Sequence, residues 1–354
     1  MGEAASRGVA GGERAVAAAR LTAQLLAGRR ARDPVAVAER LLAIQAQDLR
    51  GAQLSIRART RGSSVADVDA ALTADRSLVV TWLNRGTLHM VRSEDYPWLQ
   101  ALTAPTLVTA NATRLRQEGV SPAAAERGLR IVERALAADG PLTRAQLRER
   151  LEANDVPVAR QALIHILLLA SVRGLLVRGP MTGREQAFAL VRDWLGPQPP
   201  VDRDTALAEL ARRFLAGHAP ASDRDLAKWS GLSLGDARAG LAAIASELVE
   251  RDDGLVEPAR RPRAAPLPAP KLLGTFEPLL MGWVSRQPIL REHRDLVTSN
   301  GIFRPFALVG GRAAGTWRLE RGAVVLDLRE PVGERDAAAL DADAADLQRF
   351  LRRA

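Results

Sequence analysis

The sequence contains no cysteine and only two lysines among its 354 residues. Without cysteine the chain forms no disulfide, carries no thiolate nucleophile and offers no sulfur ligand to a metal. The histidines are scattered, and none lies at the i, i+4 spacing of a helical metal site. They are His89, His165, His218 and His293. We therefore expect no metal and no other cofactor.

Long apolar runs are also missing. The first residues lack the apolar core of a signal peptide and carry Arg7 and Arg14 among alanines. The most apolar run, residues 162–172, is too short to span a bilayer and is followed by Arg173. We therefore expect a cytoplasmic protein with no membrane partner.

The charge is strongly one-sided, with a formal net charge of +9. Lys228 and Lys271 are the two lysines, so almost all of the basic side chains are arginines. A GC-rich genome alone produces such a bias, so arginine preference by itself proves little. Arginine nevertheless binds phosphate through two hydrogen bonds and enters narrow minor grooves. The charge makes nucleic acid a candidate partner without deciding the matter.

The chain is long enough for two to four structural units, and 47% apolar with 26% charged residues is typical of a globular protein. One segment reads as helix, turn, helix and two strands, which is the layout of a winged helix. Its first helix begins at Thr143, with Gln146 completing a predicted capping box. Its second helix is predicted at 161–173.

Two further segments follow the same plan. In the later one, Ser222 is the predicted N-cap, Gly231 the turn and 234–250 the second helix. The earlier one is looser, with predicted helices at 20–28 and 34–47. A hairpin follows there, whose turn is formed by Asn84-Arg85-Gly86.

Proline-rich stretches mark the boundaries, and strands separated by glycine turns dominate the C-terminal part. We predict an α+β fold, mainly α, with three tandem winged-helix units followed by a small C-terminal β-barrel. The winged helices occupy residues 1–125, 126–197 and 198–256. Residues 257–354 hold the proline-rich linker, the barrel and a closing helix.

Five phrases occur in an order that is typical of one family. They are "LLAIQAQD", "TWLNRGTLHMVRSEDYPWL", "DLAKWSGLSLGDAR", "LLGTFEPLLMGW" and "FRPFALVGGRAAGTWR". Over roughly residues 15–350, the sequence resembles the AlkZ/YcaQ-type winged-helix DNA glycosylases. The resemblance implies excision of N7-alkylated guanine from double-stranded DNA, including bulky adducts and interstrand crosslinks. In antibiotic producers, such relatives protect the host from its own DNA-alkylating product.

The resemblance also names the catalytic element, a glutamine, an apolar residue and a second glutamine. Here it reads Gln45-Ala46-Gln47, which is similar to the AlkZ-like branch. One position departs from the family pattern, because Glu277 precedes Pro278 where an aspartate is usual. The extra methylene puts any tight contact of that carboxylate in question.

Two amides suit this chemistry. Ordinary glycoside cleavage uses two carboxylates, one of which protonates the leaving group. N7-alkylguanine already carries a positive charge and departs as a neutral base, so it needs no general acid. An amide carbonyl accepts a hydrogen bond from the attacking water and points its negative end at the cationic sugar. We predict a monofunctional glycosylase with water as nucleophile.

The spacing of the two glutamines sets a structural requirement. In a continuous helix, residues two apart point about 200° away from each other, so Gln45 and Gln47 would not serve one site. The helix must end near Gln45, which the nearby Gly51 makes possible. Ala46 should then pack behind the pair. A continuous helix would instead favour Gln45 with Asp48, which share a face at i, i+3.

Other residues are candidates for supporting roles. Asp48 is a helix-end or turn residue, or else it orients Gln45 or acts as a base. His89 on the hairpin contacts DNA, or it is structural or merely exposed. The candidate DNA contacts are Arg85, Arg92, Arg304 and Arg312, each with a solvated surface position as the alternative. Four tryptophans are predicted to lie in the core rather than to stack on bases: Trp82, Trp229, Trp283 and Trp317.

Three alternatives stay open at this point. The glutamine pair can be no more than a polar helix face. The chain can be a winged-helix transcriptional regulator, although no dimerisation zipper and no polar base-reading helix are visible. It can also sequester a toxin without cutting DNA. If crosslinks are substrates, the target guanine cannot rotate out of the stack, so we expect an open basic cleft. We also expect a monomer, because a tandem array of winged helices needs no partner.

Overall fold

The computed structural model describes residues 2–183 and 185–352, and its contacts divide the chain into two compact units. Unit 1 comprises Met1–Val68, Leu207–Trp229 and Ser233–Ala354, and unit 2 comprises Asp69–Ala206 and Ser230–Leu232. The fold is α+β and about half helical, as predicted. The four predicted domain ranges stay a prediction.

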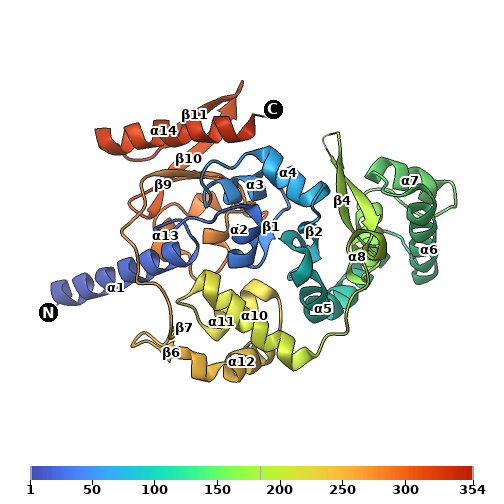
Figure 1. The fold of residues 1–354 in the computed structure, drawn as a ribbon, viewed down its shortest axis with the longest axis horizontal. Coiled ribbons are helices and arrows are strands. Elements are labelled where there is room, and N and C mark those ends of the chain that lie inside the picture. The colour runs from blue at the N-terminus through green and yellow to red at the C-terminus, as the bar shows by residue number, and fades with distance from the viewer. Residues whose placement is uncertain (1, 184, 353–354) are drawn as a thin grey trace. The chain divides into compact units, whose positions relative to one another are not determined.

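The helices outnumber the strands along the chain (Figure 1). In chain order the helices are α1 (Gly2–Ala23), α2 (Pro34–Leu41), α3 (Leu49–Arg57), α4 (Val65–Thr73), α5 (Tyr96–Gln117), α6 (Pro122–Asp139), α7 (Arg144–Glu152), α8 (Ala162–Val172), α9 (Val191–Trp194), α10 (Arg203–His218), α11 (Asp223–Ser230), α12 (Leu234–Ala243), α13 (Gln287–Leu290) and α14 (Glu334–Leu351). The strands are β1 (Ile44–Gln45), β2 (Leu78–Leu83), β3 (Thr87–Arg92), β4 (Leu176–Thr182), β5 (Glu185–Leu190), β6 (Leu248–Glu250), β7 (Val256–Pro258), β8 (Lys271–Leu273), β9 (Phe306–Val309), β10 (Arg312–Glu320) and β11 (Ala323–Leu328).

Unit 2 is built around two antiparallel hairpins whose strands lie side by side in the order β3-β2-β4-β5. The predicted turn between β2 and β3 is confirmed. Asn84 (φ 53°) and Gly86 (φ 82°) both adopt the left-handed backbone that a tight hairpin turn requires. The hairpin is joined to α8 by a hydrogen bond of 2.8 Å between the hydroxyls of Thr81 and Ser171.

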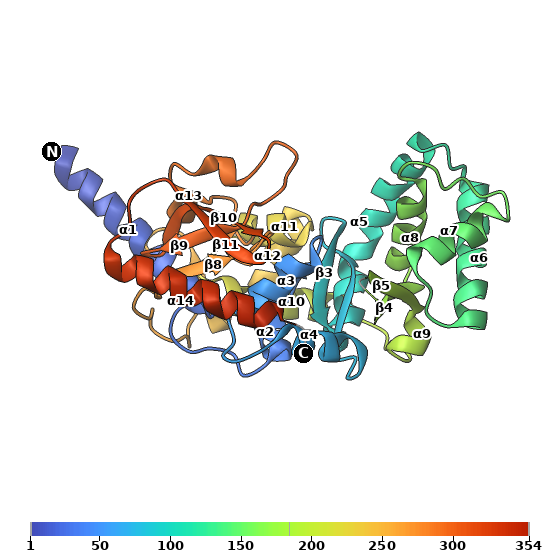
Figure 2. The same ribbon diagram turned by 90° about the horizontal axis from the view of Figure 1, so that it is seen from above.

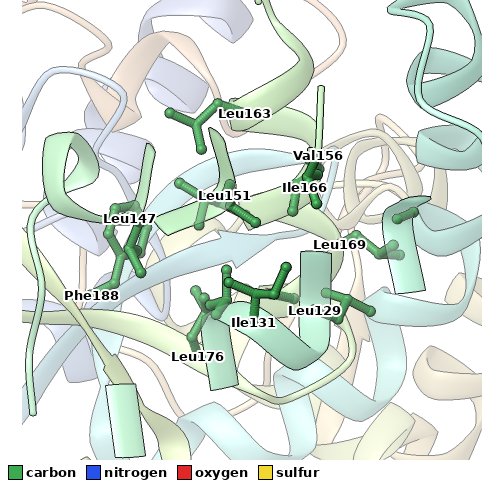
Figure 3. Close-up of a cluster of buried hydrophobic side chains, with 14 of the residues drawn as sticks. Leu129, Ile131, Leu147, Leu151, Val156, Leu163, Ile166, Leu169, Leu176 and Phe188 are labelled. Atoms are coloured by element: carbon green, nitrogen blue, oxygen red, sulfur yellow. The ribbon is translucent and has the colours of Figure 1, made fainter. Parts of the chain in front are cut away.

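Helices α6, α7 and α8 enclose the main core of unit 2. Their apolar faces interdigitate around Leu129, Leu151 and Ile166, and Phe188 of β5 closes the cluster (Figure 3). The predicted capping box of α7 is confirmed, because the Thr143 side chain accepts from the Gln146 amide and the Gln146 side chain accepts from the Thr143 amide. Helix α8 falls inside the predicted range.

The C-terminal part of unit 1 is an antiparallel sheet in the order β11-β10-β9-β8, with α14 packed along it in both views (Figures 1 and 2). Trp317 of β10 donates an indole hydrogen bond of 2.8 Å to the Leu273 carbonyl. The sequence predicted a barrel, but the described residues form an open four-stranded sheet and show no closed barrel.

The predicted helix over 234–250 is wrong in its second half. Ser222 caps α11 as expected, its hydroxyl accepting from the Asp225 amide at 3.2 Å, but α12 ends at Ala243. Residues 248–250 form β6, which pairs with β7 across a turn at Gly254 (φ 74°). The partner strand satisfies the backbone groups of these residues, and this tertiary pairing overrides their local helical preference.

The four tryptophans predicted for the core are buried, each with at most 5% of its surface exposed. In unit 1, Trp229 and Trp283 both pack against the imidazole of His218, with ring centroids 5.4 and 5.6 Å away. Among the described residues, no helix is both long and apolar enough to cross a membrane.

Two buried histidines predict how stability depends on pH. Burial lowers the pKa of His218 in unit 1 and of His89 in unit 2 to about 3, below the value of about 6.5 in an unfolded chain. The unfolded state therefore binds more protons as the pH falls below 6.5. Each histidine should cost up to about 1.4 kcal/mol of unfolding free energy per pH unit.

Denaturant unfolding between pH 7 and pH 5 measures this loss before most carboxylates titrate. His218→Gln should reduce the slope of stability against pH, whatever its effect on absolute stability. Gln198→Ala, an exposed residue that carries no titratable group, is the control and should leave the slope unchanged. A slope that His218→Gln does not alter would contradict this account.

Candidate active site

The Gln-Ala-Gln segment follows a helix that ends abruptly. Asp33 caps α2 by accepting from the Ala36 amide at 2.7 Å, and Pro34 occupies the first turn as predicted. The helix ends at Leu41, because Leu42 turns to φ 65°, ψ −51° and the Ala43 amide donates to the Leu41 carbonyl at 2.8 Å. This is a γ-turn of the rare, strained type.

Beyond the γ-turn the chain is extended. Gln45 ends the two-residue strand β1 and is 7% exposed, Ala46 is buried, and Gln47 is exposed in a bend. In an extended segment, residues two apart point to the same side. The predicted interruption of the helix is thus confirmed, although it comes four residues before Gln45. The backbone is compatible with both amides serving one site while Ala46 packs behind them.

Asp48 begins the next helix. One carboxylate oxygen accepts from the Arg50 amide at 3.0 Å, which makes Asp48 the N-cap of α3, and the other accepts from the Thr275 hydroxyl. Both oxygens therefore hold structure in place immediately after Gln47. These contacts agree with the helix-end interpretation of Asp48.

Gly51 has a different role from the one expected. It lies within α3 and not at a helix end, so the expectation that it helps to stop the preceding helix is wrong. A Cβ atom added to Gly51 would lie 2.4 Å from the Thr275 carbonyl oxygen, and one added to Gly274 would lie 3.0 Å from Leu54 Cβ. Two glycines therefore allow α3 and the segment after β8 to touch through their backbones.

A buried ion pair also stabilises the contact between α3 and the segment after β8. Arg59 and Glu277 are both fully buried, and a guanidinium nitrogen of Arg59 lies 2.5 Å from a Glu277 oxygen. Glu277 also accepts from the Ser55 hydroxyl at 3.2 Å, and Arg59 donates to the Gln24 carbonyl at 2.8 Å. The longer glutamate at this position makes the tight contact that the sequence left in question.

His89 and two of the candidate arginines belong to unit 2. His89 is 3% exposed, and its Nδ1 donates to the Thr87 carbonyl at 2.9 Å. Burial, with Arg85 in second place, holds its pKa far below neutrality, so the ring is uncharged. Arg85 is exposed at the hairpin turn, whereas Arg92 is ion-paired with Asp95 at 2.7 Å and with Glu94 at 2.5 Å.

The other candidate arginines belong to unit 1. Arg304 is exposed just before β9, and Arg312 is partly buried at the start of β10. Burial lowers the pKa of Arg312, and the positive charges of Arg291 and Arg14 lower it further. The negative charge of Glu13 acts in the opposite direction.

The structure adds positioning residues that the sequence did not reveal. Thr275, Ser55 and Arg59 connect α3 and the residues just after it to the segment around Glu277. Each of these contacts joins residues more than 200 positions apart in the sequence, so no local pattern links them. The available signal was the glycine in each partner, Gly51 and Gly274.

Comparisons with known proteins agree along nearly the whole chain. The sequence model of the family described as "DNA glycosylase AlkZ-like" matches residues 38–350. A protein of Streptomyces sahachiroi described as an interstrand DNA cross-link repair glycosylase is 29% identical over 362 residues, covering 95% of each chain. The solved structure of the Streptomyces sahachiroi DNA glycosylase AlkZ matches with a TM-score of 0.77 and 26% identity, covering 95% of this chain and 96% of that one.

The buried ion pair predicts a large effect of one small substitution. Glu277→Gln keeps the shape but leaves the Arg59 guanidinium buried without its counter-charge, and should lower the free energy of unfolding by about 3–5 kcal/mol. Glu320→Gln breaks the exposed pair with Arg318 and should change little. Denaturant unfolding of both variants measures the difference, and losses of similar size would refute the special role of Glu277.

Proposed function

The chain belongs to the AlkZ-like DNA glycosylase family, and from that premise we propose that it hydrolyses the N-glycosidic bond of N7-alkylguanine in double-stranded DNA. The observation that carries the proposal is the extended Gln45-Ala46-Gln47 segment after the γ-turn at Leu42. A helix through this segment would have separated the amides. The extended backbone lets both contribute to one site.

In this mechanism the two glutamines act on the sugar and not on the base. The alkylated base leaves as a neutral molecule, so the bond breaks without a proton donor. One amide carbonyl accepts a hydrogen bond from the attacking water and positions it. The negative end of the other stabilises the positive charge that develops on the sugar. Asp48 supports the pair through the α3 N-cap.

We also propose the finer architecture that the family resemblance implies. The order α7, α8, β4, β5 supports the second winged helix, and the order α11, α12, β6, β7 supports the third. The hairpin β2–β3 serves as the wing of the first. In this arrangement Arg85 and Arg304 contact phosphates, His89 supports the wing from its buried position, and the protein acts as a monomer in the cytoplasm.

Bulky adducts or interstrand crosslinks are the proposed natural substrates, with protection of an antibiotic producer as the purpose. Support comes from the Streptomyces sahachiroi relative, whose description names cross-link repair. A guanine bonded to the opposite strand cannot be flipped out, so the glutamines must reach the DNA on an open surface. A regulator is disfavoured, because α8 is almost entirely apolar and α12 is rich in alanine and glycine, which leaves few side chains for reading bases.

The first test uses a duplex oligonucleotide with one N7-methylguanine, followed by alkaline cleavage of abasic sites. The wild type should produce breaks well above the spontaneous background. Gln45→Ala combined with Gln47→Ala should abolish them and leave salt-sensitive duplex binding mostly intact. Gln198→Ala, which removes an exposed glutamine elsewhere, is the control. Equal loss of binding and activity would make the pair contact residues only.

The second test concerns the leaving group. If no side chain protonates the base, excision of a neutral base such as uracil should be slower than that of N7-methylguanine by a factor of at least about 100, the smallest usual contribution of a general acid. Single-turnover rates on matched oligonucleotides give the ratio. Similar rates for both lesions would show that an acid catalyst is present and that the amide mechanism is wrong.

A further inference from the structure

Unit 1 contains a polar cavity, and none of Gln45, Gln47 and Asp48 lines it. Its volume is about 390 Å³, within the range of small-ligand sites. Its walls come from the end of α3 and the loop after it, from the start of β8 and from α14. The charged side chains that line it are Arg30, Arg57, Arg61, Lys271, Asp343, Asp346 and Arg349.

Lys271 is the unusual member of this set. It is the first residue of β8, lines the cavity and is only 4% exposed. Among the described residues, none forms a hydrogen bond or an ion pair with its ammonium group. A lysine is almost never buried to this extent without a partner. The ammonium therefore lacks an acceptor from the protein and borders a cavity in which a ligand can supply one.

The carboxylates of the cavity are already engaged. Asp343 accepts from Arg57 at 2.8 Å and from the Leu272 amide at 2.7 Å. Asp346 is ion-paired with Arg349 at 2.7 Å and with Arg57 at 3.1 Å. Among the described residues, Lys271 and the exposed Arg61 form no ion pair with these two acids. The basic side chains that line the cavity outnumber the acids, so it carries an excess of positive charge.

The electrostatics of Lys271 agree with this geometry. Burial, reinforced by the charge of Arg30 and partly offset by that of Asp343, lowers its pKa to about 8. An oxyanion in the cavity would provide the missing acceptors and offset the repulsion between cations. Phosphate suits such a set of donors, because arginine binds it through two parallel hydrogen bonds and lysine binds it as a point charge.

We propose that this cavity is a phosphate-binding site, in which Lys271 and Arg61 contact the oxyanion while Arg57 and Arg30 form its positively charged wall. The phosphate belongs either to the DNA backbone or to a small phosphorylated ligand. In both cases the chemistry at the site is the same. The site does not depend on the glycosylase activity proposed above, and neither proposal fails with the other.

The scarcity of lysine makes the test direct. Protein labelled with ¹³C at lysine Cε gives two NMR signals, Lys271 and Lys228, and Lys228 is exposed and serves as an internal reference. The labelled protein is titrated with pH in chloride buffer, then with added inorganic phosphate, and separately with undamaged duplex DNA. Binding should raise the titration midpoint of Lys271 by about one pH unit or more and leave Lys228 nearly unchanged.

The two ligands distinguish the sources. A shift with duplex DNA alone assigns the site to the backbone of bound DNA, and a shift with inorganic phosphate assigns it to a small ligand as well. No shift of Lys271 with either ligand, or an equal shift of both lysines, overturns the proposal. Arg61→Gln should weaken phosphate binding about tenfold or more, whereas Arg318→Gln, an exposed arginine of β10 that does not line the cavity, should not.

Discussion

The contact between Arg59 and Glu277 is the constraint on which the arrangement of unit 1 depends. Both side chains are fully buried, and each buried charge costs several kcal/mol unless its hydrogen bonds are satisfied. Here Glu277 also accepts from Ser55 and from the Leu279 amide, while Arg59 also donates to Gln24. These partners come from the end of α1, from α3 and from the segment after β8, so the pair is satisfied only when the three are assembled.

The candidate active site is built directly on that assembly. Asp48 caps α3 and accepts from Thr275, two residues before Glu277, so the same contact that buries the ion pair fixes the residue after Gln47. Several arginines are therefore structural, including Arg57, which donates to the Leu272 carbonyl, and Arg20, which donates to the Pro220 carbonyl. The net charge of +9 overstates the positive charge that is available to DNA.

Features set by neighbouring residues were predictable from sequence. The Thr143 cap, the turn at Asn84 and the start of α2 at Pro34 each depend on a few adjacent side chains. Features set by distant partners were not. The residues of β6 have a helical pattern, and only the pairing with β7 makes them a strand. The segment predicted as a barrel forms an open sheet. No residue near Glu277 in the sequence indicates that Arg59 is its partner. The positions of the glutamines were recognisable from the sequence. The turn that precedes them was not, because it occurs at Leu42, where no glycine or proline indicates a turn.

Because of the γ-turn at Leu42, the conformation of the glutamine segment depends on contacts outside the segment. Residues 34–47 have the apolar spacing of one continuous helix, and the turn holds a backbone conformation that costs on the order of 1–3 kcal/mol. The extended conformation is therefore held by contacts from outside the segment, among them those of α3 with α2 and β1. A local opening that frees α3 would let the segment coil into the helix its sequence prefers. The segment would then lose the extended backbone that the proposed mechanism requires at a lower free energy than the chain loses its fold.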